Sequence, residues 1–208
     1  MSDDIHLSLI LVAAFLAVAS PGPSNMTIAG TSMTSGRKMG LALASGVVTG
    51  SLIWSTAGAV GLSALMMANA WVVETIRYFG AAYILYLGFK SAKSAITPGD
   101  AMPKGMMVTS AKRAYAKGLA LHLTNPKAIL FFGSLYSIAI PATATATDLA
   151  IVVIAIGFQG FLILHGYALL FSSAAMVLTY LKLRRWFDGS FALAFGFMGL
   201  KILTAKLR

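Results

Sequence analysis

The 208-residue sequence contains no cysteine, which excludes disulfide bonds, thiol redox chemistry and cysteine-ligated metals. Charged residues are also scarce: they make up 11% of the chain, whereas soluble domains usually carry about 25%. Because 58% of the residues are hydrophobic, we predict an all-α polytopic membrane protein. Its length allows about six transmembrane helices of roughly 20 residues in a single domain over residues 1–208.

Acidic residues are few, six against sixteen Lys and Arg, and the net charge is +10. No nucleic-acid-binding motif accompanies this charge, so we expect no nucleic-acid partner and assign the cations to cytoplasmic loops. The first residues, Met-Ser-Asp-Asp, are acidic where a signal peptide would be basic. The first apolar segment is therefore expected to remain as a span, with the N-terminus outside.

Catalytic and metal-binding patterns are lacking as well. The three histidines are scattered, and neither H-E-x-x-H nor G-x-S-x-G occurs. Since a membrane-embedded enzyme needs a nucleophile–base or metal constellation, the sequence predicts no enzyme, no cofactor and no metal site.

Two breaks interrupt the apolar segments that are present. Residues 20–25 read Ser-Pro-Gly-Pro-Ser-Asn and follow an apolar run that begins at residue 5, and residues 125–127, Asn-Pro-Lys, interrupt the segment 118–140. Proline lacks an N–H and clashes with the preceding helical turn. In hydrocarbon such a break is tolerated only where it faces protein or a wet cavity, and broken helices are a recurring feature of transporters.

Each break is expected to start a new half-helix inside the membrane. Ser and Asn are favoured N-caps and Pro is favoured at the first helical position, as in Ser20-Pro21 and Asn125-Pro126. The N-terminus of a half-helix presents free N–H groups and a partial positive charge. Two such ends facing each other would bind a carboxylate.

Lys127 and Asn25 add polar groups to these breaks. An intramembrane lysine is a functional candidate, although its ammonium can also snorkel or pair with a backbone carbonyl. Asn25 either orients a substrate amine or satisfies backbone groups freed by the prolines. The predicted substrate-binding residues are Pro21, Gly22, Pro23, Ser24, Asn25, Asn125, Pro126 and Lys127. No Asp or Glu is expected near the breaks, which argues against a dibasic substrate and an acidic proton carrier.

Further polar and small residues suggest proton coupling and helix packing. His165, His122 and Gln159 are candidates for proton coupling, or for hydrogen bonds across helix interfaces. Four glycines are predicted to let helices pack closely: Gly36, Gly40, Gly46 and Gly50. The spacing Gly46-x-x-x-Gly50 fits either packing within one chain or a homodimer face.

The C-terminal third is harder to divide into spans. The apolar run over residues 149–181 exceeds one straight span, so it must tilt, kink or project into the cytoplasm. The last segment, residues 187–205, is short for a span and precedes a basic C-terminus. We prefer six spans, because two half-repeats of about 1–92 and 115–208, joined by a basic cytoplasmic loop over 93–114, explain the two breaks.

Several motifs occur together in the first two thirds of the sequence. They are the Pro-Gly-Pro of residues 21–23, the glycine spacings 36/40 and 46/50, the stretch 80–88, and Asn-Pro-Lys-Ala-Ile-Leu-Phe-Phe at 125–132. Together they resemble the motifs of the LysE/RhtB family of amino-acid exporters. The resemblance covers the first four spans and implies two inverted three-helix repeats with broken helices 1 and 4.

The resemblance also implies a function. It points to efflux of small amino acids or derivatives, such as homoserine, homoserine lactone, threonine or leucine, across the bacterial cytoplasmic membrane, driven by the proton gradient. The alternatives are an exporter of another small solute or ion, and a membrane subunit with no transport activity of its own.

Overall fold

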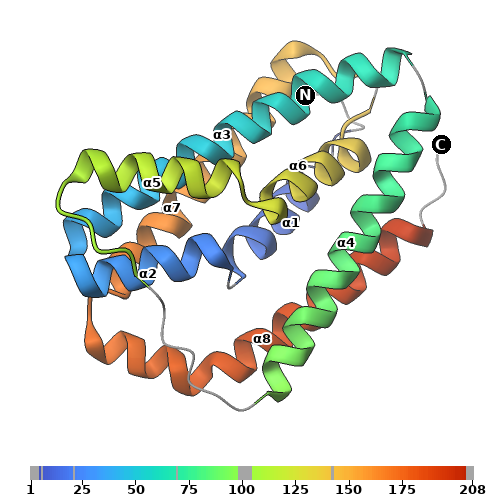
Figure 1. The fold of residues 1–208 in the computed structure, drawn as a ribbon. Helices are drawn as coiled ribbons and strands as arrows, with labels where there is room; N and C mark the ends of the chain where they lie inside the picture. The colour runs from blue at the N-terminus through green and yellow to red at the C-terminus, as the bar shows by residue number, and fades with distance from the viewer. Residues whose placement is uncertain are drawn as a thin grey trace.

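The computed structural model describes residues 5, 7–20, 22–68, 70–97, 105–141 and 143–204. The described part consists of helices without strands, which confirms the predicted all-α class (Figure 1). In chain order the helices are α1 (Leu7–Ala19), α2 (Pro23–Ser35), α3 (Arg37–Ala68), α4 (Ala70–Ile96), α5 (Ala111–Leu123), α6 (Pro126–Ala139), α7 (Ala146–Leu170) and α8 (Ala174–Thr204).

The first break separates α1 from α2, whose axes are bent by 52°. The prediction that Ser20 caps the second half-helix is wrong. Pro23 takes the first helical position and the extended Gly22 precedes it as the N-cap, without a side-chain capping bond. Ser20 Oγ instead donates back to the carbonyl of Ala17 at 3.1 Å. Pro21 lies outside the described residues.

The second break separates α5 from α6 and has the predicted cap. Asn125 is extended, with φ −80° and ψ 111°, and Pro126 follows at the first helical position. The Oδ1 atom of Asn125 accepts a hydrogen bond from the backbone N–H of Lys127 at 3.0 Å. This bond satisfies one of the free donors at the start of α6.

A third interruption divides the long C-terminal apolar run. α7 ends at Leu170, a turn covers residues 171–173, and α8 then continues for 31 residues. The hydroxyl of Ser172 donates to the carbonyl of Leu169 at 2.6 Å, a local bond that competes with helix continuation. The predicted short last segment is therefore the C-terminal part of a long helix, about 46 Å at 1.5 Å per residue.

Length and composition identify two membrane-crossing helices among the described residues. They are Arg37–Gly61 within α3 and the whole of α7. The bent pair of α1 and α2 adds a third if it forms one broken span. These helices indicate a multi-pass membrane protein. The arrangement of six spans in two repeats stays a prediction.

Helix α3 is the centre of the packing. It packs against α2, α5 and α7, while α4 runs along α8 and connects to the other helices mainly through α6. Figure 1 shows the α4–α8 pair on one side of the molecule, set beside the group formed by the other helices. This division places a cavity between the two groups, described below.

Glycines permit the close approach of α3 and α5. A Cβ on Gly46 would overlap the carbonyl oxygen of Tyr115, and a Cβ on Gly118 would overlap that of Leu43. The two backbones are thus in direct contact, as small residues allow in membrane helices. Gly46 faces α5 within the same chain and so does not form a free homodimer face.

The other predicted pair of glycines divides into two roles. A Cβ on Gly40 would overlap the hydroxyl of Ser32, so this glycine packs α3 against α2. Gly36 lies between these helices with φ +86°, and no neighbouring atom in the described part of the chain lies within 4 Å of its Cβ position. Its role is to provide a backbone conformation that other residues rarely adopt, rather than close packing.

Candidate functional site

The two helix breaks meet in space although they are about a hundred residues apart in sequence. The ammonium of Lys127 donates to the carbonyl oxygen of Ser20 at 3.3 Å and also to its hydroxyl. The amide of Asn125 donates to the hydroxyl of Ser24 at 3.3 Å. Ser20, Ser24 and Asn125 are all buried, so these bonds join the breaks inside the protein.

Asn25 satisfies the backbone at the end of α1. Its Nδ2 donates to the carbonyl of Val18 at 2.7 Å and to that of Ser20 at 3.4 Å. Of the two predicted roles, the structure shows the one in which Asn25 serves carbonyls that lose their helical partners at the break. The lysine pairs with Ser20 in the same way, so both side chains stabilise the broken segment.

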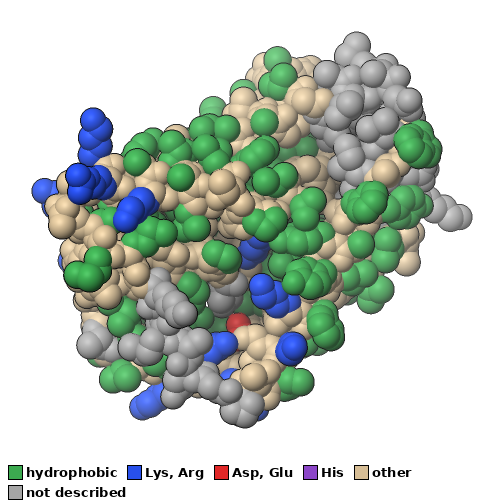
Figure 2. All heavy atoms as spheres, viewed as in Figure 1, with side chains coloured by type: hydrophobic (Ala, Val, Ile, Leu, Met, Phe, Trp, Pro, Cys, Tyr) green, Lys and Arg blue, Asp and Glu red, His purple; other side chains and the backbone are tan. Residues whose placement is uncertain are grey.

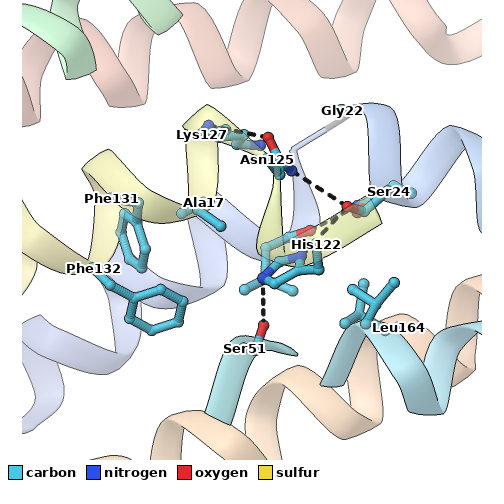
Figure 3. Close-up of a pocket in the computed structure, with 14 residues that line it drawn as sticks. Ala17, Gly22, Ser24, Ser51, His122, Asn125, Lys127, Phe131, Phe132 and Leu164 are labelled. Carbon is cyan, nitrogen blue, oxygen red and sulfur yellow. Dashed lines mark hydrogen bonds between the residues drawn. The ribbon is translucent and has the colours of Figure 1, made fainter. Parts of the chain in front are cut away.

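A chain of hydrogen bonds runs from the second break to α3 (Figure 3). His122, on α5, contacts the Ser24 hydroxyl through Nδ1 at 3.4 Å and the Ser51 hydroxyl through Nε2 at 2.9 Å. Gly50 makes room for this ring, because a Cβ there would lie 3.0 Å from the Cβ of His122. The imidazole thus connects α2, α3 and α5 beside the breaks.

A small cavity, here named the inner cavity, lies at this point and holds about 40 Å³. Figure 3 shows Phe131 and Phe132 on one side of it and Leu164 on the other, with His122 between. Such a volume has room for about one to three waters. The inner cavity is therefore too small for an amino acid in this conformation.

A larger outer cavity of about 360 Å³ lies on the other side of the breaks, between α4, α8 and the starts of α2 and α6. Its polar and charged lining residues are Ser20, Tyr83, Tyr86, Lys90, Ser91, Ser94, Asn125, Lys127, Tyr180, Arg184 and Asp188. Figure 2 shows a hollow in which acidic side-chain atoms lie among Lys and Arg side chains. Sites for small molecules usually occupy roughly 300–1,000 Å³, and the outer cavity has this size.

Three predicted site residues line both cavities. Gly22, Asn125 and Lys127 each border the inner and the outer cavity. Ser24 and Asn25 line the inner cavity alone, and the two prolines at the starts of α2 and α6 line the outer one. The broken segments therefore form the wall between the two cavities.

Asp188 corrects one inference from the sequence. No Asp or Glu was expected near the breaks, yet this residue of α8 lines the outer cavity together with Asn125 and Lys127. Its side chain is 6% exposed, and its Oδ2 accepts from Ser94 Oγ at 2.7 Å and lies 3.4 Å from Arg184 Nε. The i,i+4 spacing of Arg184 and Asp188 could have indicated their ion pair, but not its place near the breaks.

The two remaining proton-coupling candidates lie outside both cavity linings. His165 contacts the Ser45 hydroxyl at 3.0 Å and the carbonyl of Phe161 at 2.9 Å. Gln159 donates to the carbonyl of Leu11 at 3.1 Å, and its Oε1 is buried without a partner in the described structure. Of the three candidates, the structure brings His122 alone to the breaks. Among the described residues, no cluster of three His, Cys, Asp or Glu is arranged to hold a metal ion.

The family model named LysE type translocator matches residues 15–206, nearly the whole chain. The chain belongs to the LysE-type translocator family. The match includes both helix breaks and the residues of both cavities, so the site described above lies within the family's shared region.

Relatives of this LysE-type translocator carry efflux names. A threonine efflux protein of Escherichia coli (strain K12) is 26% identical over 208 residues, covering 96% of this chain and all of the relative. A leucine efflux protein of Enterobacter sp. (strain 638) is 32% identical over 175 residues, covering 84% and 82%. A threonine efflux protein of Salmonella typhi is 25% identical, covering 95% and 97%. No solved structure matches the chain.

Proposed function

We propose that this LysE-type translocator is a secondary exporter of small neutral amino acids or their derivatives, such as threonine, leucine, homoserine or homoserine lactone. Its place would be the bacterial cytoplasmic membrane, and its driving force the proton gradient, used by antiport. Family membership and the names of the threonine and leucine efflux relatives support export of this class of solute.

The observation that carries the proposal is that the two helix breaks contact each other and together form the wall between the two cavities. The start of α6 places the positive end of its helix dipole at the outer cavity, and Lys127 adds a positive charge at the same place. This combination suits the carboxylate that amino acids share. Gly22 at the start of α2 supplies a second helix N-terminus in the same wall.

The order of helices supports a six-span arrangement in two inverted repeats of about 1–92 and 115–208. A broken pair of 13 and 13 residues, α1 and α2, precedes the long helices α3 and α4. A broken pair of 13 and 14 residues, α5 and α6, precedes the long helices α7 and α8. In this proposal the N-terminus is periplasmic, and rocking of one half against the other exposes the site alternately to the two sides.

His122 is the residue we propose for proton coupling. It borders the inner cavity and joins Ser24, beside the first break, to Ser51 on α3. A histidine in this position can change its hydrogen bonds on protonation, because the charged ring is a donor at both nitrogens.

An efflux assay tests the proposed function. Cells that overproduce the chain are loaded with a panel of dipeptides, whose hydrolysis raises internal amino acids, and release into the medium is followed with and without an uncoupler. Faster release of one class of amino acid, lost with the uncoupler, is expected. Release of no amino acid, with the protein present in the membrane, would contradict the proposal; a parallel assay with metal ions then tests for an ion exporter.

A further inference from the structure

We propose that Asp188 binds the ammonium group of the exported amino acid in the outer cavity, and that Arg184 occupies this position when the cavity is empty. The inference rests on the proposed function and adds to it the site of the second charged group of the substrate.

The outer cavity has two charged poles. Lys127 and the start of α6 form one pole, and the buried carboxylate of Asp188 lies on the wall contributed by α8. Lys90 and Arg184 also line the cavity, and Asp188 is the one acidic side chain on its wall among the described residues. Because an amino acid carries one positive and one negative charge, its ammonium needs an anionic partner once it leaves water.

The contacts of Asp188 hold the carboxylate in place without fully engaging it. Ser94, on α4, donates to Oδ2 at 2.7 Å and also accepts from the Nη2 of Arg184 at 2.9 Å. The Arg184 Nε lies 3.4 Å from the same Oδ2. Charge-assisted N–H···O bonds are usually about 2.7–2.9 Å long, and the strongest arginine pairs are bidentate. The direct ion pair is therefore loose, while the serine contact is short.

A loose internal ion pair is suited to exchange with a ligand. In the empty cavity Arg184 keeps the buried carboxylate from being unpaired, a state that is strongly unfavourable. A substrate ammonium can replace the guanidinium at Oδ2, while Ser94 continues to orient the carboxylate. The side chain of Arg184 is 22% exposed, so its guanidinium can remain hydrated after the exchange.

The proposal predicts that Asp188 determines the preference for an amino acid over the matching α-hydroxy acid, which has the same carboxylate and side chain but no ammonium. Purified protein is reconstituted in proteoliposomes, and inhibition of the counterflow of a radiolabelled amino acid is measured with both compounds. The amino acid is the one that the efflux assay identifies. Wild type is expected to prefer the amino acid by at least roughly tenfold.

Two variants separate the roles of the pair. Arg184→Gln keeps the carboxylate and removes its internal partner, so the preference should persist and the affinity for the amino acid should rise. Arg184→Gln combined with Asp188→Asn avoids an unpaired buried charge and should abolish the preference. Asp148→Asn is the matched control, because Asp148 is also a buried acid but caps α7 through Thr145, outside the two cavity linings.

Each other outcome counts against the inference. The inference is overturned if wild type shows no preference for the amino acid, or if the double variant keeps that preference. It is also overturned if the double variant weakens inhibition by the amino acid and by the α-hydroxy acid to the same extent. An Asp148→Asn variant that loses the preference would also overturn it, since the effect would not depend on the cavity. Wild type that moves no amino acid would instead refute the proposed function itself, before any variant is made.

Discussion

Lys127 at the start of α6 donates its ammonium hydrogen bonds to Ser20 at the end of α1, across 107 positions of sequence. An ammonium inside a membrane protein is costly unless its donors are satisfied. Here the backbone carbonyl exposed by one helix break satisfies the lysine that follows the other. The two breaks therefore depend on each other for the partners of their polar groups.

Replacing Lys127 with alanine is expected to abolish amino-acid efflux while the protein still reaches the membrane. The substitution removes the positive charge from the wall of both cavities and leaves the carbonyl of Ser20 without this donor. Efflux from dipeptide-loaded cells measures the effect, with membrane content determined by immunoblot. Lys93→Ala, at an exposed position in the last turn of α4, is the control and should export normally. Full activity of Lys127→Ala would remove this residue from the site.

Asn125→Ala should abolish efflux and also lower stability. It removes the cap of α6, which is worth about 0.5–2 kcal/mol, together with the bond to Ser24. Asn125→Ser retains a capping hydroxyl but lacks the amide donor, so it should recover most of the stability and little of the efflux. Thermal unfolding in detergent and the efflux assay separate the two effects. Equal activity of the serine variant and wild type would show that capping alone is required.

Gly46→Ala is expected to destabilise the protein by about 1–3 kcal/mol, because the new methyl group overlaps the carbonyl of Tyr115 and forces α5 away from α3. Gly61→Ala is the matched control on the same helix, since no neighbouring atom of the described residues lies within 4 Å of its Cβ position. The unfolding midpoint of each variant in detergent gives the comparison. Similar midpoints for both variants would argue against the close packing of α3 and α5.

His122→Gln should uncouple export from the proton gradient. The variant is expected to keep counterflow of the amino acid in proteoliposomes but to lose the efflux that an uncoupler inhibits, because glutamine cannot carry the proton. His165→Gln, which removes a histidine from outside both cavity linings, should keep both activities. If His122→Gln retains efflux that the uncoupler inhibits, the proton is carried by another group.

The sequence predicts features that depend on neighbouring residues better than features that depend on tertiary contacts. The cap at Asn125 follows from local chemistry, because an asparagine before a proline has few other roles at a helix start. At the first break either Pro21 or Pro23 could take the first helical position. The prediction placed the helix start at Pro21, whereas the helix begins at Pro23.

Asp188 could not be placed at the site by local reasoning. Its position on the lining of the outer cavity, which Lys127 shares, results from the packing of α8 along α4, which brings it to Ser94. A kink was among the alternatives for the run over residues 149–181, but the position of the turn between α7 and α8 could not be predicted, for a different reason. Its serines are a weak signal inside a long apolar run, and the run continues on both sides of the turn. The contact between Asp188 and Ser94 could not be predicted because the two residues are far apart in sequence. The turn could not be predicted because the residues on both sides of it are equally hydrophobic.

The wall between the cavities is assembled from two short segments, Gly22 on one and Asn125 with Lys127 on the other. Neither segment forms a partition by itself. A protein that carried only the first half of the chain would have Gly22 but would lack Asn125 and Lys127, which form the rest of the wall. The proposed translocation site would thus need both segments, and a truncation that separates them would remove the wall and the proposed binding groups together.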